Sequence, residues 1–310
     1  MSAHPRFDPA TGEMLFHAYM AAGPFTDDMG LYRINQDGFM TDAHLFKAPY
    51  SAMVHDFVVT ENYIIFPIMP ITGDMERAMS GQPPFAWEPD VPTQVGVMPR
   101  DGTPEDIKWY EGDACYVFHF LNGRDDNGVI TIEACHFDSP PLFPMKNGNP
   151  TPPNIHPYFA RWTLDLNASN PRVKYEPLGD HGSEFPVMDR RYAMADYSHG
   201  WYTSTDRKIP ALIPDSDAVY NTIVHFNVKT GAVDRYSFES GYVSEPMFVP
   251  RSVTAPEGDG WVLSCVYDLR TNTSALCVFD AQNIASGPIG RAQVAHRVPV
   301  CFHGTWKPAA

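Results

Sequence analysis

The sequence is dominated by short apolar runs, rich in β-branched and aromatic residues, that alternate with turns of glycine, asparagine and aspartate. "DFVVTENYIIFPI" (56–68) reads as two strands about the turn "TEN". "ACYVFHFLNGRDDNGVITIEACHF" (114–137) has the same pattern with a turn expected at "NGRDDNG", and "GWVLSCVYDLRTNTSALCVFDA" (260–281) turns at "RTNT". Such hairpin patterns, together with 30 prolines and 22 glycines, predict an all-β fold.

Helical periodicity is scarce. One short helix is expected around "GDMERAMSG" (73–81), inside a proline-rich loop. The stretch 136–157 is the most linker-like, and it is either a domain boundary or a long surface loop. Because the strand pattern resumes unchanged after it, we expect a single domain over 1–310, with loop insertions at about 67–105 and 138–158.

The net charge is −15, from 37 acidic and 22 basic side chains. Such a surface repels phosphate backbones, so nucleic acid is not an expected partner. No run of 18 apolar residues and no charged start before an apolar stretch is present, so we expect no transmembrane segment and a cytoplasmic location.

The five cysteines are an odd number, widely spaced and without a CxxC pair, which argues against a disulfide framework or a zinc ribbon. We expect them to be small buried hydrophobic residues. They are Cys115, Cys135, Cys265, Cys277 and Cys301.

Four of the twelve histidines stand out by their surroundings. His4 lies in "SAHPRFDPATGE", His55 in "SAMVHDFVVTENY", His119 in "CYVFHFLNGRDDNG" and His303 in "VPVCFHGTWKP". His55 and His119 fall in apolar runs that read as strands, where an imidazole is costly unless it is hydrogen-bonded or bound to a metal. Neighbouring residues of a strand face opposite ways, so Asp56 is expected to point away from any ion bound by His55.

Six ordered motifs resemble the carotenoid cleavage oxygenase family. They are "SAHPRFDPATGE", "MVHDFVVTENYIIF", "FHFLNGRDDNG", "SEFPVMD", "YVSEPMFVPR" and "FHGTW", and together they run from residue 2 to residue 306. The segment "PITGDMERAMSGQPPFAWEPDVPTQVGVMPRDG" (70–102) is similar to the bacterial lignostilbene dioxygenase branch in particular.

The resemblance implies a seven-bladed β-propeller with one iron(II) ion on its axis. It also implies the site residues. The metal ligands are His4, His55, His119 and His303, and the carboxylates that orient them are Glu184, expected to support His119, and Glu245, expected to support His303. These six landmarks are separated by 51 to 65 residues, a length that suits one four-stranded propeller blade.

Members of that family carry a longer portion before the first histidine, whereas only Met-Ser-Ala precedes His4. The resemblance therefore implies an N-terminally truncated propeller of about five blades, lacking a third glutamate and a substrate-binding tyrosine and lysine. The chain would be a fragment, or a second chain would supply the rest. His4 would be poorly fixed so close to a terminus.

The activity implied is that of an iron(II) dioxygenase, which cleaves the alkene double bond of a small apolar or phenolic substrate with dioxygen to give two carbonyl products. The substrate would be stilbene-like or an apocarotenoid, and the oligomeric state is not indicated. The apolar residues of the 69–87 loop would either wall a substrate tunnel or pack against the propeller: Met69, Ile71, Met75, Met79, Phe85 and Trp87.

Three alternatives remain. The chain could be an inactive truncated propeller. It could be a calcium-dependent lactonase of propeller type, but that site needs oxygen ligands, and the apolar surroundings of His55 and His119 disfavour it. An isomerohydrolase of the same family is disfavoured by the lignostilbene-like segment.

Overall fold

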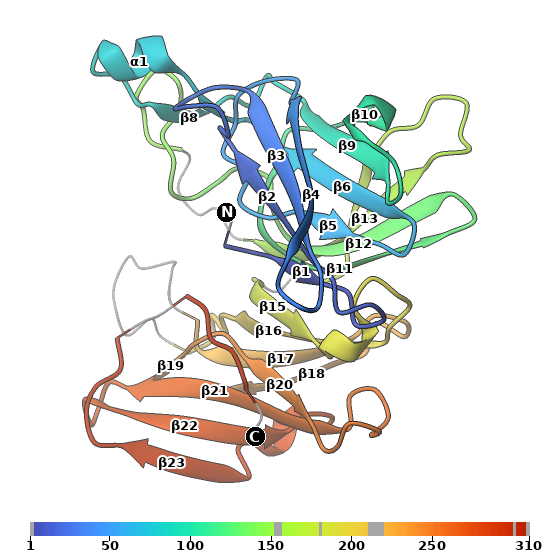
Figure 1. Cartoon of the computed structure of the whole chain (residues 1–310). Coiled ribbons are helices and arrows are strands. Elements are labelled where there is room, and N and C mark those ends of the chain that lie inside the picture. The colour runs from blue at the N-terminus through green and yellow to red at the C-terminus, as the bar shows by residue number, and fades with distance from the viewer. Residues whose placement is uncertain (1–2, 152–156, 180–181, 210–219, 300–301, 308–310) are drawn as a thin grey trace. The chain divides into compact units, whose positions relative to one another are not determined.

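The computed structural model describes residues 3–151, 157–179, 182–209, 220–299 and 302–307 (Figure 1). The elements are mainly antiparallel strands, grouped into successive sheets in chain order. The prediction of an all-β fold is confirmed. Within the described residues, no helix is both long enough and apolar enough to cross a membrane.

The chain divides into two compact units. The first consists of Met1–Ile155, Ala160–Pro177 and Ala193–Ala195, and the second of His156–Phe159, Leu178–Tyr192 and Asp196–Ala310. The single propeller domain over 1–310, its two insertions and its number of blades stay predictions.

Three four-stranded sheets belong to the first unit. The first sheet runs in the order β1 (Arg6–Phe7), β2 (Met14–Tyr19), β3 (Asp28–Ile34), β4 (Met40–Lys47). The second has the order β10 (Lys108–Gly112), β9 (Thr93–Pro99), β6 (Tyr63–Ile68), β5 (Val58–Val59). The third has the order β11 (Tyr116–Asp126), β12 (Val129–Phe137), β13 (Tyr158–Asp165), β14 (Lys174–Pro177).

The β11–β12 hairpin turns more tightly than expected. Its connection is only Asn127–Gly128, with positive φ angles of 47° and 79°, the values that a two-residue hairpin turn requires. The prediction of a turn over 122–128 was wrong in extent, because 122–126 continue the strand. Gly123 instead allows Val58 to pack closely against β11, since a Cβ atom at residue 123 would lie 2.3 Å from Val58 Cγ1.

The other two expected hairpins are confirmed. Val58 pairs with Ile65 across the turn at Thr60–Asn62. In the second unit, Asp268 pairs with Thr273 across a turn that includes Asn272, whose φ is positive.

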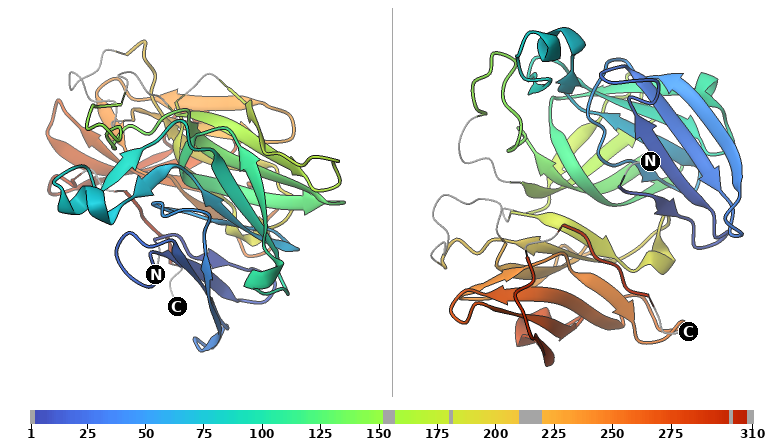
Figure 2. Two further views of the ribbon diagram at one scale, coloured as in Figure 1. Left: turned by 90° about the horizontal axis from the view of Figure 1, so that it is seen from above. Right: turned by 60° about the vertical axis from the view of Figure 1, so that its left-hand side comes forward.

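The chain leaves the second sheet between β6 and β9. This excursion forms a two-stranded sheet, β7 (Ile71–Gly73) and β8 (Phe85–Trp87), joined by the short helix α1 (Met75–Met79), as expected. The Asp74 side chain caps the helix by accepting a 2.8 Å hydrogen bond from the Arg77 amide. Figure 2 shows α1 at the periphery of the first unit. The 3₁₀ turn η1 (Pro104–Asp106) precedes β10.

The core of the first unit lies on both faces of the second sheet. In β6, Ile64 and Phe66 are fully buried in a cluster with Leu15 and Leu31 of the first sheet. Ile65 faces the opposite way, into a cluster with residues of the third sheet such as Trp162. A strand buried on both faces reads as a continuous apolar run, which explains "YIIFPI".

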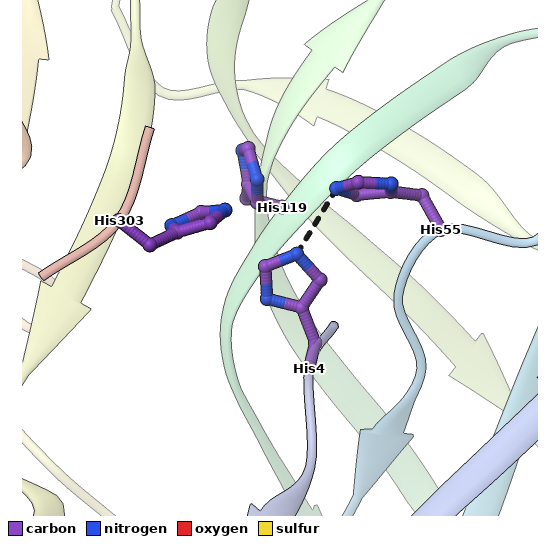
Figure 3. Close-up of side chains that lie close together, drawn as sticks. All are labelled: His4, His55, His119 and His303. Carbon is purple, nitrogen blue, oxygen red and sulfur yellow. Dashed lines mark hydrogen bonds between the residues drawn. The ribbon is translucent and has the colours of Figure 1, made fainter. Parts of the chain in front are cut away.

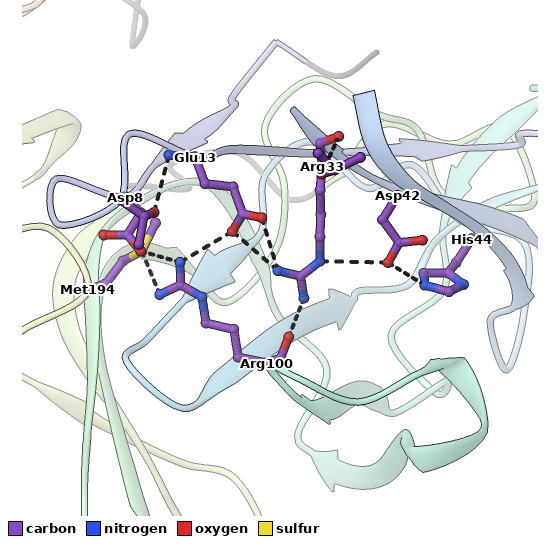
Figure 4. Close-up of polar contacts among 9 residues, drawn as sticks. Asp8, Glu13, Arg33, Asp42, His44, Arg100 and Met194 are labelled. Atoms are coloured by element: carbon purple, nitrogen blue, oxygen red, sulfur yellow. Dashed lines mark hydrogen bonds and ion pairs between the residues drawn. The ribbon is translucent and has the colours of Figure 1, made fainter. Parts of the chain in front are cut away.

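Ion pairs join the first sheet to the end of β9 (Figure 4). Arg100 donates to Asp8, and Glu13 lies 3.4 Å from Arg100 and 3.2 Å from Arg33. Burial by itself would raise the pKa of Asp8, but hydrogen bonds from the Ala10 amide and the Arg100 guanidinium outweigh it and lower this pKa.

Two sheets belong to the second unit. One has the order β15 (Glu184–Met188), β16 (His199–Ser204), β17 (Thr222–Asn227), β18 (Val233–Ser237). The other has the order β19 (Gly241–Val243), β21 (Gly260–Asp268), β22 (Thr273–Asp280), β23 (Gly290–Val294), with β20 (Met247–Pro250) also paired to β21. Two 3₁₀ turns are η2 (Arg190–Tyr192) and η3 (Ile284–Ser286).

The core of the second unit gathers around Trp201, Val262 and Phe279, all fully buried. The Trp201 indole donates a 2.8 Å hydrogen bond to the Ala281 carbonyl, which satisfies its polar atom.

Of the described cysteines, Cys115, Cys135 and Cys277 are buried and Cys265 is half-buried. Burial raises the pKa of Cys115 to about 12, so this thiol stays protonated and unreactive. Cys301 lies outside the described residues.

We expect Asp8→Asn to lower the free energy of unfolding by about 1–3 kcal/mol at neutral pH, since a buried charged hydrogen bond to Arg100 is lost. The folded-state pKa of Asp8 is depressed, so its contribution is present above the ordinary value of 3.8 and is lost as the pH falls below it. Urea denaturation across this pH range measures the difference. Asp37→Asn, at an exposed residue of the β3–β4 turn, is the control. A loss of unfolding free energy that is the same at all pH values would contradict the assignment of Asp8 as a charged partner of Arg100.

Candidate metal centre

Five of the six landmark residues lie near the beginning of successive sheets, and His303 follows the last strand, β23. His4 precedes β1 by two residues, His55 precedes β5 by three, and His119 is in β11. Glu184 is the first residue of β15, and Glu245 follows β19 by two residues. Their regular spacing therefore reflects one sheet of four or five strands for each interval.

Three of the expected ligands converge in the first unit (Figure 3). One ring nitrogen each of His4, His55 and His119 lies within 4.8 Å of the other two. The Nε2 atoms of His4 and His55 are 3.0 Å apart, and the His119 ring centroid is 4.9 Å from that of His4 and 5.2 Å from that of His55.

His119 reaches this position through an irregularity of its strand. Val117 pairs with His136, but the next pair is Phe120 with Ala134, so β11 holds one extra residue here. A β-bulge of this kind bends the strand and redirects side chains. The pattern of apolar residues does not show where a bulge falls.

His55 does not lie on a strand. Residues 53–57 have no regular structure, and β5 consists of Val58–Val59 alone. The prediction that places His55 in an apolar strand was therefore wrong, and so was the argument for Asp56 based on strand alternation. The Asp56 carboxylate is buried and lies 2.6 Å from the half-buried Arg6 guanidinium, with which it forms an ion pair.

The three imidazoles suit a divalent transition metal. Burial lowers the pKa of His4 to about 3, although the Asp56 carboxylate opposes the shift, so this ring is neutral. Neutral imidazole is the form that binds a metal. Metal–imidazole bonds of about 2.1 Å place neighbouring ligand nitrogens about 3 Å apart. The spacing of the His4 and His55 nitrogens, 3.0 Å, fits that requirement.

The fourth expected ligand, His303, belongs to the second unit. Its Nδ1 atom is 3.1 Å from Glu245 Oε1, and the other oxygen of this carboxylate accepts a 2.8 Å hydrogen bond from the Gly304 amide. The expected contact between Glu245 and His303 is therefore present. It leaves Nε2 of His303 as the atom that could bind a metal.

Glu184 is buried, with 4% of its surface exposed, and its Oε2 atom accepts a 2.8 Å hydrogen bond from the Phe185 amide. Its expected support of His119 stays a prediction.

The apolar residues of the 69–87 loop divide into two groups. Met69, Ile71 and Trp87 are buried in the core cluster of the second and third sheets, and the half-buried Phe85 packs against it, which supports the packing alternative. Met75 and Met79 of α1 are 44% and 83% exposed.

A profile of the family described as Retinal pigment epithelial membrane protein matches residues 1–308. The chain belongs to this family. The resemblance to carotenoid cleavage oxygenases is thereby confirmed, since proteins of that name are also among its relatives. The chain spans 65% of the length of the curated relatives it matches first.

Among these family members, isoeugenol monooxygenase of Pseudomonas putida is 37% identical over 99% of the chain. Lignostilbene-alpha,beta-dioxygenase isozyme III of Sphingomonas paucimobilis is 34% identical over the whole chain. The crystal structure of Pseudomonas brassicacearum lignostilbene dioxygenase matches 99% of this chain and 66% of its own, with a TM-score of 0.94 and 37% identity. A cobalt-substituted Synechocystis apocarotenoid oxygenase matches with a TM-score of 0.85 and 26% identity.

We expect Glu245→Ala to loosen the segment 302–307, because the Gly304 amide and His303 lose their shared acceptor. Hydrogen–deuterium exchange should become faster in a peptide that covers 302–307 and should be unchanged in β21 and β22. Glu239→Ala is the matched control, since the Glu239 side chain is 81% exposed. Unchanged exchange in 302–307 would show that Glu245 does not hold this segment.

Proposed function

We propose that this chain carries the metal centre of an iron(II) oxygenase that cleaves an alkene double bond with dioxygen. The observation that carries the proposal is the convergence of His4, His55 and His119, which lie near the start of three successive sheets of a chain in this family. His303 completes the ligand set through its place in the "FHGTW" motif.

Four neutral imidazoles suit iron(II) and leave coordination positions open. The iron, when bound, supplies the redox chemistry that activates dioxygen. The protein's part is to keep the His4 ring neutral by burying it, and to orient His303 through the contact of its Nδ1 atom with Glu245. Glu184 is proposed to do the same for His119.

The proposed substrate is a small apolar or phenolic alkene of the stilbene or phenylpropene type, in line with the names of the relatives. Phe118 supports an apolar substrate, because its ring lies 5.6 Å from that of His55 and 6.3 Å from that of His119. Addition of both atoms of dioxygen across the double bond gives two aldehydes and needs no further reductant. A cytoplasmic location stays a prediction.

The test is to load the purified chain with iron(II) without oxygen and then to add air and a 4-hydroxystilbene. We expect near-equimolar iron, and one molecule of each aldehyde for every alkene and dioxygen consumed, measured by chromatography and an oxygen electrode. Near-equimolar iron without aldehyde would favour the inactive-propeller alternative. No retained iron would contradict the metal centre.

His55→Ala separates the metal centre from adventitious binding. We expect it to lose most of the bound iron, because one of three converging ligands is removed. His44→Ala is the matched control, since His44 lies on β4 and is hydrogen-bonded to Asp42 at 2.7 Å, outside the cluster. Equal iron contents in the two variants would contradict the assignment of His55.

A further inference from the structure

One buried ion pair touches all three histidine-bearing segments of the first unit. Arg6 follows His4 by two residues, and its Nη2 atom lies 2.7 Å and 2.6 Å from the two oxygens of Asp56. Asp56 directly follows His55. Its Oδ2 atom accepts a 2.9 Å hydrogen bond from the Phe120 amide, next to His119.

Further hydrogen bonds hold the backbone around the Arg6–Asp56 ion pair in place. Arg6 Nε donates to the Phe57 carbonyl at 2.9 Å, and Asp56 Oδ1 accepts from the Phe57 amide at 2.8 Å. The Asp56 side chain is 2% exposed and that of Arg6 is 23% exposed. A buried carboxylate is stable only when its partners stay in place, so breaking this pair has a large structural cost.

The sheets alone fix the three histidines weakly. β1 and β5 have two residues each, His55 lies outside any strand, and His119 lies where the β11 ladder is interrupted. Ladder hydrogen bonds are therefore few at each histidine. The contacts of Arg6 and Asp56 provide a link between these segments that the ladders do not.

We infer that Arg6 and Asp56 are positioning residues of the metal centre, which hold the segments of His4, His55 and His119 in a metal-ready arrangement through one ion pair and the Phe120 amide. The inference rests on the proposed function, since it assumes that these histidines bind a metal. A site organised before binding pays less ordering entropy when the ion enters, so its affinity is higher.

Cobalt(II) is the probe, because its visible absorption reports the number and geometry of its ligands without turnover. In Asp56→Asn and Arg6→Met we expect cobalt to bind roughly 10- to 100-fold more weakly, as is typical when a residue that supports a metal ligand is changed. We also expect an altered absorption band at saturating cobalt. Arg6→Lys keeps the charge and should recover part of the affinity.

The double variant Arg6→Met/Asp56→Asn tests whether the two residues act as a unit. We expect it to lose little more affinity than the weaker-binding single variant, because either change alone already breaks the pair. Arg33→Met is the matched control. It removes another ion pair of the same unit, with Glu13, and should lower the melting temperature without changing cobalt affinity or spectrum.

The outcomes separate the two hypotheses. If the parent chain binds no cobalt, the proposed function fails. If the parent binds cobalt and the folded single variants have its affinity and spectrum, the positioning role is overturned and the ion pair is structural only. Should Asp56→Asn fail to fold, as judged by circular dichroism, Arg6→Met is compared with Arg6→Lys instead. Arg6 is partly exposed, so we expect both of these variants to fold, and the same two outcomes decide between the hypotheses.

Discussion

The first unit depends on the burial of both faces of its second sheet. Ile64 and Ile65 of β6 are neighbours in the chain, yet they enter separate core clusters with the first and third sheets. Side chains alternate along a strand, so one apolar strand can join two layers of core. The sheets on either side are held against this strand, and the residues that begin each sheet are brought into a common region.

The candidate metal centre lies where the regular strand structure of the first unit is interrupted. His4 lies before the short strand β1, His55 lies in an irregular segment, and His119 lies at a β-bulge. Irregular backbone lets side chains from different sheets point at one place, but it gives up the ladder hydrogen bonds that fix a strand. The buried pair of Arg6 and Asp56 restores part of that constraint, at the cost of desolvating two charges.

The sequence predicted local structure correctly where that structure depends on residues close together in the chain. The hairpin at Thr60–Asn62 and the helix Met75–Met79 depend on turn and capping residues within a few positions, and both were predicted. The polar run 122–126 was misread as a turn. It forms strand because Arg124 pairs with the buried Glu133 at 2.9 Å and Gly123 packs closely on Val58. Val58 is distant in sequence from Gly123, and Glu133 meets Arg124 only once β11 has paired with β12.

By itself, the sequence determined that the chain folds from antiparallel strands, belongs to the carotenoid oxygenase family and carries its histidine motifs in order. Only the tertiary structure decided that His4, His55 and His119 converge, that Asp56 binds Arg6, and that His55 lies outside a strand. The reason is the separation along the chain. The nitrogens of His4 and His55 are 3.0 Å apart although 51 residues separate them, and such a contact is set by how whole sheets pack rather than by neighbouring residues.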